Sequence, residues 1–247
     1  MQQLIRDLNI LVVDDEPDLV EAVSFEFELL GAQVRCAHNG DHAWEVIREG
    51  GVDVVISDIR MAGSDGVELL RKTMRAESED APPVIFMSGY ADITLEEAYD
   101  EGAIAVFGKP YKRNELLDVV AGVAESSVKR WSTIGRAESS EIRALKEDRT
   151  AGVQARVQVG RGGVFMPLSE GFPHISDLVS FEFEIEDGHT VMGNGWVRWV
   201  RRSPRKGLLS GVGIEVRGIF GNSRLASVEK FCQHSCSVAF IPIGKST

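Results

Sequence analysis

Short apolar segments alternate with amphipathic ones between residues 9 and 124, and this alternation constrains the fold more than any other feature of the chain. The apolar segments are rich in Val, Ile and Leu, as in strands that are covered on both faces. They are Ile10–Val13, Gln33–Ala37, Val52–Ile56, Pro83–Met87 and Ile104–Gly108. The segments between them have helical periodicity: Pro17–Leu30, Asp41–Arg48, Gly66–Arg75, Thr94–Glu101 and Arg113–Val123. This order predicts an α/β fold, a doubly wound parallel sheet of five strands.

Acidic residues follow two of the predicted strands. Asp14 and Asp15 follow the first strand, and Asp58 follows the third. In a doubly wound sheet of order 2-1-3-4-5, ligands bind beyond the carboxyl ends of strands 1 and 3, where the winding reverses. Crowded carboxylates repel one another unless a cation neutralises them, and oxygen ligands suit Mg²⁺. Because Ser88 and Lys109 end strands 4 and 5, the set predicts a magnesium-dependent site for a phosphoryl group.

Four stretches resemble the receiver domains of two-component response regulators: ILVVDDEPDLVEAV, VDVVISDIRMAGSDGVELL, VIFMSGYAD and GAIAVFGKPY. The resemblance covers roughly residues 8–125 and implies a flavodoxin-like fold. It implies that Asp58 is the phosphoacceptor and attacks a phosphohistidine of a sensor histidine kinase or phosphotransfer protein, or a small phosphodonor. The other residues that it assigns are the Mg²⁺ ligands Asp14, Asp15, Asp58 and the backbone carbonyl of Arg60, and the phosphoryl-binding residues Ser88 and Lys109.

Each of these residues has a simpler explanation when it is taken alone. Acidic residues beside Pro17 favour a helix start, Asp58 could begin a turn, and Lys109 could be a surface lysine. Their combination at the ends of four strands favours phosphorylation, and a pseudo-receiver that acts only as a scaffold is the alternative. Val106 departs from the resemblance, because receivers usually carry Tyr or Phe at this switch position, three residues before the lysine. How the signal leaves the domain is therefore left open.

Charge divides the chain into an acidic and a weakly basic part. Residues 1–124 hold 10 Lys and Arg against 25 Asp and Glu, whereas residues 151–247 hold 11 against 8. Between them, residues 125–150 are rich in Ser and charged side chains, with sparse apolar residues at near-helical spacing. We therefore expect a receiver domain (1–124), a helical linker (125–150) and a second domain (151–247). A dimerising coiled coil is the alternative for the linker.

Apolar residues recur at every second position after residue 150. Phe181, Phe183 and Ile185 alternate with polar residues, and Asp187-Gly188 is a strong hairpin signal. The predicted elements are strands at Val153–Val159, Gly163–Met166, Ser180–Glu186, Thr190–Val200 and Leu208–Val216, and a helix at Asn222–Gln233. This pattern predicts an all-β unit, a small closed antiparallel barrel with a C-terminal helix. No helix-turn-helix pair is present, so we expect no DNA binding.

The stretches VQVGRGGVFM, DLVSFEFEI, GWVRWVRR and SGVGIEV resemble the PilZ family of small barrels over roughly residues 150–235. The family often binds cyclic di-GMP, through Arg-x-x-x-Arg ahead of the first strand and Asp/Asn-x-Ser-x-x-Gly on it. Here neither motif is intact, so we expect a PilZ-like module that binds a protein partner. Cyclic di-GMP binding gated by receiver phosphorylation is the alternative. The residues that could contact this ligand or another anion are Arg149, Arg156, Gln158, Gly160, Arg161 and Gly163.

Two tryptophans mark a candidate partner surface. Trp196 and Trp199 are expected on opposite faces of one strand, so at most one of them belongs to a core. The other, beside Arg198, is a candidate contact for a protein partner, with rim packing as the alternative. Arg201 and Arg205 have the Arg-x-x-x-Arg spacing but lie in a turn, and we interpret them as part of a solvated basic hairpin.

The three cysteines of the chain argue against a disulfide framework and favour a reducing compartment. Cys232, His234 and Cys236 offer no fourth zinc ligand nearby, so reduced thiols are the preferred interpretation. No apolar run reaches the length of about 18 residues that a membrane span needs. We therefore expect a cytoplasmic response regulator without membrane insertion and without enzymatic activity beyond self-dephosphorylation. Homodimerisation is left open.

Overall fold

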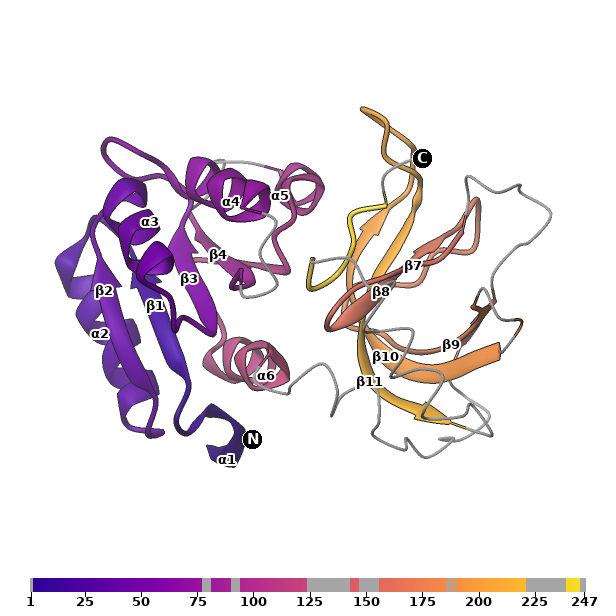
Figure 1. The fold of residues 1–247 in the computed structure, drawn as a ribbon, viewed down its shortest axis with the longest axis horizontal. Helices are drawn as coiled ribbons and strands as arrows, with labels where there is room; N and C mark the ends of the chain where they lie inside the picture. The colour runs from indigo at the N-terminus through magenta and orange to yellow at the C-terminus, as the bar shows by residue number, and fades with distance from the viewer. Residues whose placement is uncertain are drawn as a thin grey trace. The chain divides into compact units, whose positions relative to one another are not determined.

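The computed structural model contains two units, Met1–Glu125 and Ser126–Thr247, and each is built around a sheet of its own (Figure 1). The residues that it describes are 2–76, 81–89, 94–123, 143–146, 156–185, 188, 190–220 and 239–244. Within these ranges, no helix combines the length and the apolar composition that a membrane crossing requires.

Five parallel strands form the sheet of the first unit, in the order β2-β1-β3-β4-β5. They are β1 (Asn9–Val13), β2 (Gln33–Ala37), β3 (Val54–Asp58), β4 (Val84–Ser88) and β5 (Ala105–Gly108). This order confirms the predicted doubly wound fold, and it places β1 beside β3, where the winding reverses. β3 ends two residues later than predicted, so Asp58 is its last residue.

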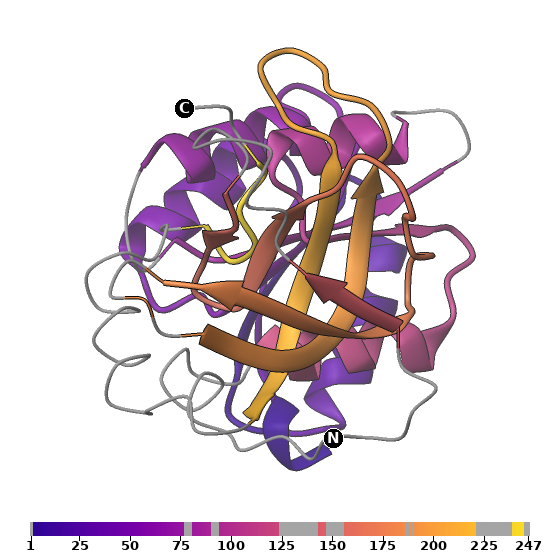
Figure 2. The ribbon, with the colours of Figure 1, turned by 90° about the vertical axis from the view of Figure 1, so that its right-hand side faces the viewer.

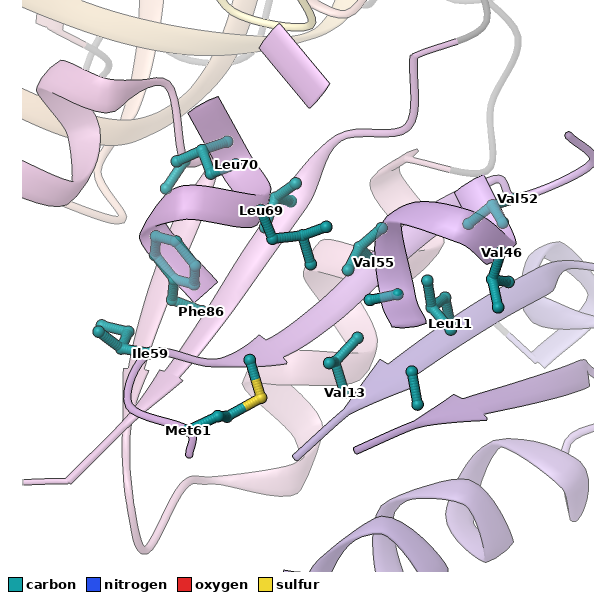
Figure 3. Close-up of a cluster of buried hydrophobic side chains, with 14 of the residues drawn as sticks. Leu11, Val13, Val46, Val52, Val55, Ile59, Met61, Leu69, Leu70 and Phe86 are labelled. Atoms are coloured by element: carbon teal, nitrogen blue, oxygen red, sulfur yellow. The ribbon is translucent and has the colours of Figure 1, made fainter. Parts of the chain in front are cut away.

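Helices cover both faces of this sheet, with α2 and α6 on one side and α3, α4 and α5 on the other (Figure 1). The helices are α1 (Gln2–Ile5), α2 (Pro17–Glu28), α3 (Gly40–Glu49), α4 (Gly66–Arg75), α5 (Leu95–Glu101) and α6 (Arg113–Val123). Figure 3 shows the core between the sheet and α4, where Leu11, Val55, Leu69 and Phe86 are fully buried. Burial on both faces explains why β1, β3 and β4 read as apolar runs, whereas the edge strands β2 and β5 are partly exposed.

The start of α4 fixes the main chain at the end of β3. The backbone N–H of Gly66 donates to the carbonyl of Ile59 at 2.9 Å. A Cβ atom on Gly66 would lie 2.2 Å from the carbonyl oxygen of Asp58, which is too close for any side chain. Glycine therefore lets the helix approach the strand end and hold the backbone of Asp58 in position.

Six strands form the sheet of the second unit, in the order β6-β9-β10-β11-β8-β7 (Figure 2). They are β6 (Arg143–Lys146), β7 (Gln158–Val159), β8 (Gly163–Pro167), β9 (Leu178–Glu184), β10 (Thr190–Arg201) and β11 (Gly211–Phe220). β9 and β10 form the predicted antiparallel hairpin, with Glu184 opposite Thr190. The remaining pairs are antiparallel except that β6 runs parallel to β9.

The second sheet differs from the predicted barrel. Among the strands that the structure describes, no ladder joins β6 to β7, so these strands form an open sheet and not the closed barrel that we predicted. The predicted strand Val153–Val159 is described only from residue 156, and its paired part is Gln158–Val159. The predicted helix Asn222–Gln233 lies outside the described residues.

Part of the predicted linker is a strand of the second sheet. A helix over residues 125–150 is wrong for Arg143–Lys146, which pairs with Val179–Glu182 of β9. Leu145 is 5% exposed and packs into the same core cluster as Phe181 and Val197. Tertiary packing thus overrides the near-helical spacing of the apolar residues, which alone could not distinguish a short strand from a helix. Residues 124–142 and 147–150 lie outside the described residues.

Replacing Leu145 by alanine tests this assignment. Because its side chain is buried in the core of the second unit, Leu145→Ala should lower the free energy of unfolding by about 2–3 kcal/mol. Hydrogen exchange of the β9 amides measures the effect in the unit concerned. The control is Ala144→Ser at the exposed neighbouring position, which should change little. Equal exchange rates in both variants would instead support a solvated linker.

Candidate functional site

One ammonium group joins two carboxylates from different strands of the first sheet. Lys109 Nζ, which directly follows β5, lies 2.7 Å from Asp14 Oδ2 and 2.6 Å from Asp58 Oδ1. Asp14 directly follows β1, and Asp58 ends β3. The parallel strands therefore deliver all three groups to the carboxyl edge of the sheet, at the switch point where ligand binding was predicted.

Burial makes these charges strongly dependent on one another. The side chains of Asp14 and Asp58 are 5% and 9% exposed, and that of Lys109 is 21% exposed. Burial raises the pKa of the Asp58 carboxyl, and the hydrogen bond and charge of Lys109 offset only part of this effect. Burial alone would lower the pKa of Lys109, but its hydrogen bonds to Asp14 and Asp58 outweigh burial and raise that pKa. The lysine is therefore the resident positive charge of a site that holds excess negative charge.

The third predicted carboxylate, Asp15, has a hydrogen-bond partner in the loop after β3. Asp15 is exposed, and its Oδ2 accepts a hydrogen bond from the backbone N–H of Ala62 at 2.9 Å. Within the described ranges, no three His, Cys, Asp or Glu side chains are grouped so that they could hold a metal ion. Asp15 is thus oriented by the loop after β3, and the convergence of three carboxylates on one ion stays a prediction.

Backbone groups orient the two buried carboxylates. The N–H of Arg60 donates to Asp58 Oδ2 at 2.9 Å, and the N–H of Glu16 donates to Asp14 Oδ1 at 3.0 Å. Each carboxylate thus has one oxygen on a main-chain donor and the other on Lys109. The predicted role of the Arg60 carbonyl as a metal ligand stays a prediction.

Ser88 lies at the same edge, as predicted. It ends β4, next to Asp58 in the sheet, since Met87 pairs with Asp58. Its carbonyl accepts the backbone N–H of Lys109 at 2.7 Å, and its hydroxyl donates to the carbonyl of Gly89 at 2.7 Å. The peptide bond between Lys109 and Pro110 is cis. The serine hydroxyl and the lysine ammonium thus come from neighbouring strands.

Val106 lies within the sheet and not at this edge. It pairs with Phe86 of β4 and packs, partly buried, against the hydrophobic cluster of Figure 3. His38 is a neighbour of the site to which the sequence analysis assigned no role. His38 is exposed, but its Nδ1 lies 3.3 Å from the carbonyl oxygen of Asp14. The position of His38 directly after β2 was the sequence feature that could have placed it near the site.

At the predicted anion site of the second unit, main-chain N–H groups already donate to carbonyl groups of the same chain. The N–H groups of Arg161 and Gly162 donate to the carbonyls of Ala239 and Phe240 at 3.0 and 2.9 Å, and that of Gly160 donates to Gly163 at 2.8 Å. The structure places Gln158 in β7 and Gly163 at the start of β8. Arg156 is exposed, and Arg149 lies outside the described residues. The main-chain N–H groups of this turn are therefore already hydrogen-bonded and not available to bind an anion.

The two tryptophans share a face of β10, so their predicted placement on opposite faces is wrong. Trp196 pairs with Glu215 and Trp199 with Gly213, and these partners are two residues apart on β11. The pairing shifts between Val197 and Trp199, and this bulge reverses the alternation. Trp199 is buried and stacked on Phe165, whereas Trp196 is half-buried.

Two arginines of this region have structural partners that the sequence did not reveal. Arg198, a candidate partner contact, donates through Nε to Glu215 Oε2 at 2.6 Å, and Glu215 is 1% exposed. Arg201 is 2% exposed and is therefore not part of a solvated hairpin, as we had interpreted it. Its Nη1 donates to the carbonyls of Leu209 and Ile243 at 2.9 and 2.8 Å. The single acid in the apolar run of β11 was the one signal for a buried ion pair.

Removing the shared ammonium should destabilise the first sheet. Lys109→Gln leaves two buried carboxylates without their cation, and we expect the free energy of unfolding at pH 7 without divalent cations to fall by about 2–3 kcal/mol. Hydrogen exchange of β1 and β3 amides measures this loss. Lys112→Gln, which removes an exposed pair with Glu115, should cost under about 1 kcal/mol. Similar losses in the two variants would contradict the assigned role of Lys109.

Known proteins that resemble the chain match its first unit. The response regulator receiver domain family matches residues 10–121. The regulatory protein AtoC of Escherichia coli (strain K12) is 41% identical over 109 residues, which are 44% of this chain and 23% of AtoC. Sporulation initiation phosphotransferase F of Bacillus subtilis (strain 168) is 31% identical over 113 residues, which are 45% of this chain and 90% of that protein.

A longer match extends past the first unit. The C4-dicarboxylate transport transcriptional regulatory protein DctD of Pseudomonas aeruginosa is 32% identical over 158 residues, 62% of this chain and 34% of DctD. The chain thus spans only about a quarter to a third of the lengths of AtoC and DctD. Nearly all of the phosphotransferase is covered, however, and the family match at residues 10–121 contains the doubly wound sheet with its acidic edge. The chain therefore belongs to the response regulator receiver family, and residues 10–121 are its receiver domain.

Proposed function

We propose that the chain is a phosphorylated response regulator in which Asp58 accepts the phosphoryl group. The observation that carries this proposal is the Asp58 carboxylate at the switch point of the sheet, with the Lys109 ammonium 2.6 Å from one of its oxygens. Arg60 N–H fixes the second oxygen. A buried, oriented carboxylate beside a fixed positive charge is suited to nucleophilic attack at phosphorus.

Asp58, Lys109 and Ser88 have different roles in the proposed phosphoryl transfer. An oxygen of Asp58 forms the new bond to phosphorus, while the bond from phosphorus to the donor's imidazole nitrogen breaks and leaves its electron pair on that nitrogen, which takes up a proton. Lys109 neutralises a phosphoryl oxygen in the product, and the Ser88 hydroxyl turns from the Gly89 carbonyl to donate to another. Hydrolysis of the acyl phosphate is the only turnover that we propose.

The donor set of this edge suits Mg²⁺, which receiver domains generally use for phosphorylation. Asp14 and Asp58 supply buried carboxylate oxygens, and the two carboxylates share the ammonium of Lys109. We propose that Asp14, Asp15, Asp58 and the carbonyl of Arg60 would hold the ion. The ion supplies charge neutralisation for the incoming phosphoryl group.

The family implies a sensor histidine kinase or a phosphotransfer protein as the donor, and we propose that transfer takes place in the cytoplasm. We propose that the second unit is a PilZ-like module that binds a protein partner and not cyclic di-GMP. The occupied main-chain donors at Arg161 and Gly162 support this choice. Trp196 is half-buried and Met192 is 41% exposed, which leaves apolar surface on β10 for such a contact.

Phosphorylation of the full chain should depend on Asp58. After incubation with acetyl phosphate and Mg²⁺, the wild-type protein should give a shifted band on a Phos-tag gel, and Asp58→Asn should give none because the nucleophile is lost. The matched control is Asp18→Asn, an exposed acid at the start of α2, which should retain the shift. Absence of a shift in the wild type would identify an unphosphorylated scaffold and contradict the proposal.

Cyclic di-GMP should not bind the full chain. Because the turn at residues 160–163 donates its main-chain hydrogen bonds to the chain itself, isothermal titration calorimetry should show no heat of binding at micromolar protein and ligand. Saturable binding with a micromolar Kd, abolished by Arg161→Ala, would replace the partner-binding module with a second-messenger sensor. A control titration of Asp58→Asn separates this result from any effect of phosphorylation.

A further inference from the structure

The segment Ala239–Gly244, which we call the strap, packs on the turn between β7 and β8 and on the side chain of Phe165 in β8. Figure 1 draws it in yellow beside the strands of the second unit. Phe240 and Ile241 are 9% and 3% exposed. They are buried, yet the strap contributes no residue to the core cluster around Phe181. The strap is thus packed on the sheet without being part of that core.

The strap lies on the face of the sheet opposite this core cluster. Val164 and Met166 of β8 belong to the cluster, so Phe165 between them points to the other face. There its ring stacks on Trp199 at a centroid distance of 5.6 Å. A Cβ atom on Gly244 of the strap would lie 2.4 Å from the Phe165 ring, which shows how closely the strap is seated on this aromatic pair.

Glycines form the seat of the strap at the β7–β8 turn. A Cβ atom on Gly162 would lie 2.2 Å from the ring of Phe240. One on Gly160 would lie 2.4 Å from the carbonyl oxygen of Ala239, and one on Gly163 would lie 2.8 Å from Cγ1 of Ile241. At these three positions the lack of a side chain makes room for the strap. We call the space over Gly162, which the Phe240 ring fills, the Gly162 channel.

Hydrogen-bond donors of the sheet bind the carbonyl groups of the strap. Arg161 and Gly162 donate main-chain N–H groups to Ala239 and Phe240, and Leu209 donates its N–H to Gly244 at 2.8 Å. Arg201 donates Nη1 to the carbonyls of Leu209 and Ile243, and its guanidinium lies 5.0 Å from the centroid of the Trp199 ring. Main-chain donors and apolar pockets are the two elements by which proteins recognise peptide segments.

We propose that this face is a peptide-binding groove, occupied in the same chain by the strap. We define the groove by the glycines of residues 160–163, Phe165, Trp199, Arg201 and Leu209. Its ligand in a partner is an uncharged peptide with an aromatic side chain for the Gly162 channel and an aliphatic one beside it. The strap itself, AFIPIG, displays this chemistry. This inference rests on the proposed partner-binding role of the second unit and names the surface and the class of ligand.

Competition from the strap sets the affinity of the groove. An attached segment acts at an effective concentration of about millimolar, so a free peptide binds only in proportion to the fraction of molecules in which the groove is open. Loosening the strap without touching the groove should therefore strengthen binding of a free peptide. Phe240→Ala does this, because it removes the ring from the Gly162 channel and changes no groove residue.

The test is fluorescence anisotropy of a labelled AFIPIG peptide titrated with the full chain. Phe240→Ala should bind the peptide about tenfold or more tightly than the wild type, because a larger fraction of its grooves is open. Phe25→Ala, which removes an exposed phenylalanine of α2, should bind like the wild type. Adding Gly162→Ala to Phe240→Ala should abolish the gain, because the new methyl group fills the channel that the peptide's ring needs.

Equal affinities of the wild type and Phe240→Ala, or no binding by either, would overturn the proposal. If near-ultraviolet circular dichroism shows that Phe240→Ala is unfolded, Ile241→Ala takes its place. If both variants unfold, the strap is an integral part of the unit and the proposal is also overturned. Asp58 phosphorylation is measured on the same samples by Phos-tag gel, so failure of the groove and failure of the receiver function give different results.

Discussion

The contact of one lysine with two buried aspartates is the interaction on which the receiver domain depends. Lys109, Asp14 and Asp58 come from positions far apart in the chain, and only the parallel order of β1, β3 and β5 brings them to one edge. The same contact leaves the site with more negative than positive charge. That imbalance favours a further cation, which together with Lys109 can neutralise the charge of an incoming phosphoryl group.

The receiver fold and most of its site could be predicted from the sequence, because each signal there is local. Runs such as Ile10–Val13 identify buried strands, and in a doubly wound sheet the residues after such strands must meet at one edge. This reasoning does not determine where the carboxylate of Asp15 lies. Its position in the chain places it at the edge, but a hydrogen bond to Ala62 determines where its carboxylate lies. A rotamer and a loop conformation are not encoded in the spacing.

The second unit was harder to predict because its informative contacts are long-range. Leu145 has the spacing of a helix face but pairs in a strand beside β9, more than 30 positions later. One bulge at Arg198 puts Trp196 and Trp199 on the same face, and no alternation pattern reveals a bulge in advance. Arg201 was interpreted as part of a solvated hairpin and Gly162 was given no role, yet each contacts the strap, about 40 and 80 positions away. The glycines at residues 160–163, which allow the strap to approach closely, were the one sequence feature that indicated this packing.

The two units thus pose different physical problems. The receiver concentrates carboxylates at a sheet edge and needs a cation to neutralise them. In the second unit, the main-chain donors of the β7–β8 turn are satisfied within the chain. Under the proposed function, a protein partner would contact the apolar surface on β10 or displace the strap.

The central claim is that Asp58, and no other residue, becomes an acyl phosphate. Treating the chain with acetyl phosphate and Mg²⁺, reducing it with borohydride and sequencing its peptides by mass spectrometry locates the modified residue, because an aspartyl phosphate is converted to homoserine. The account predicts homoserine at position 58 alone, and only when Mg²⁺ is present. Homoserine at Asp14 or Asp15, or an unmodified peptide around residue 58, would contradict it.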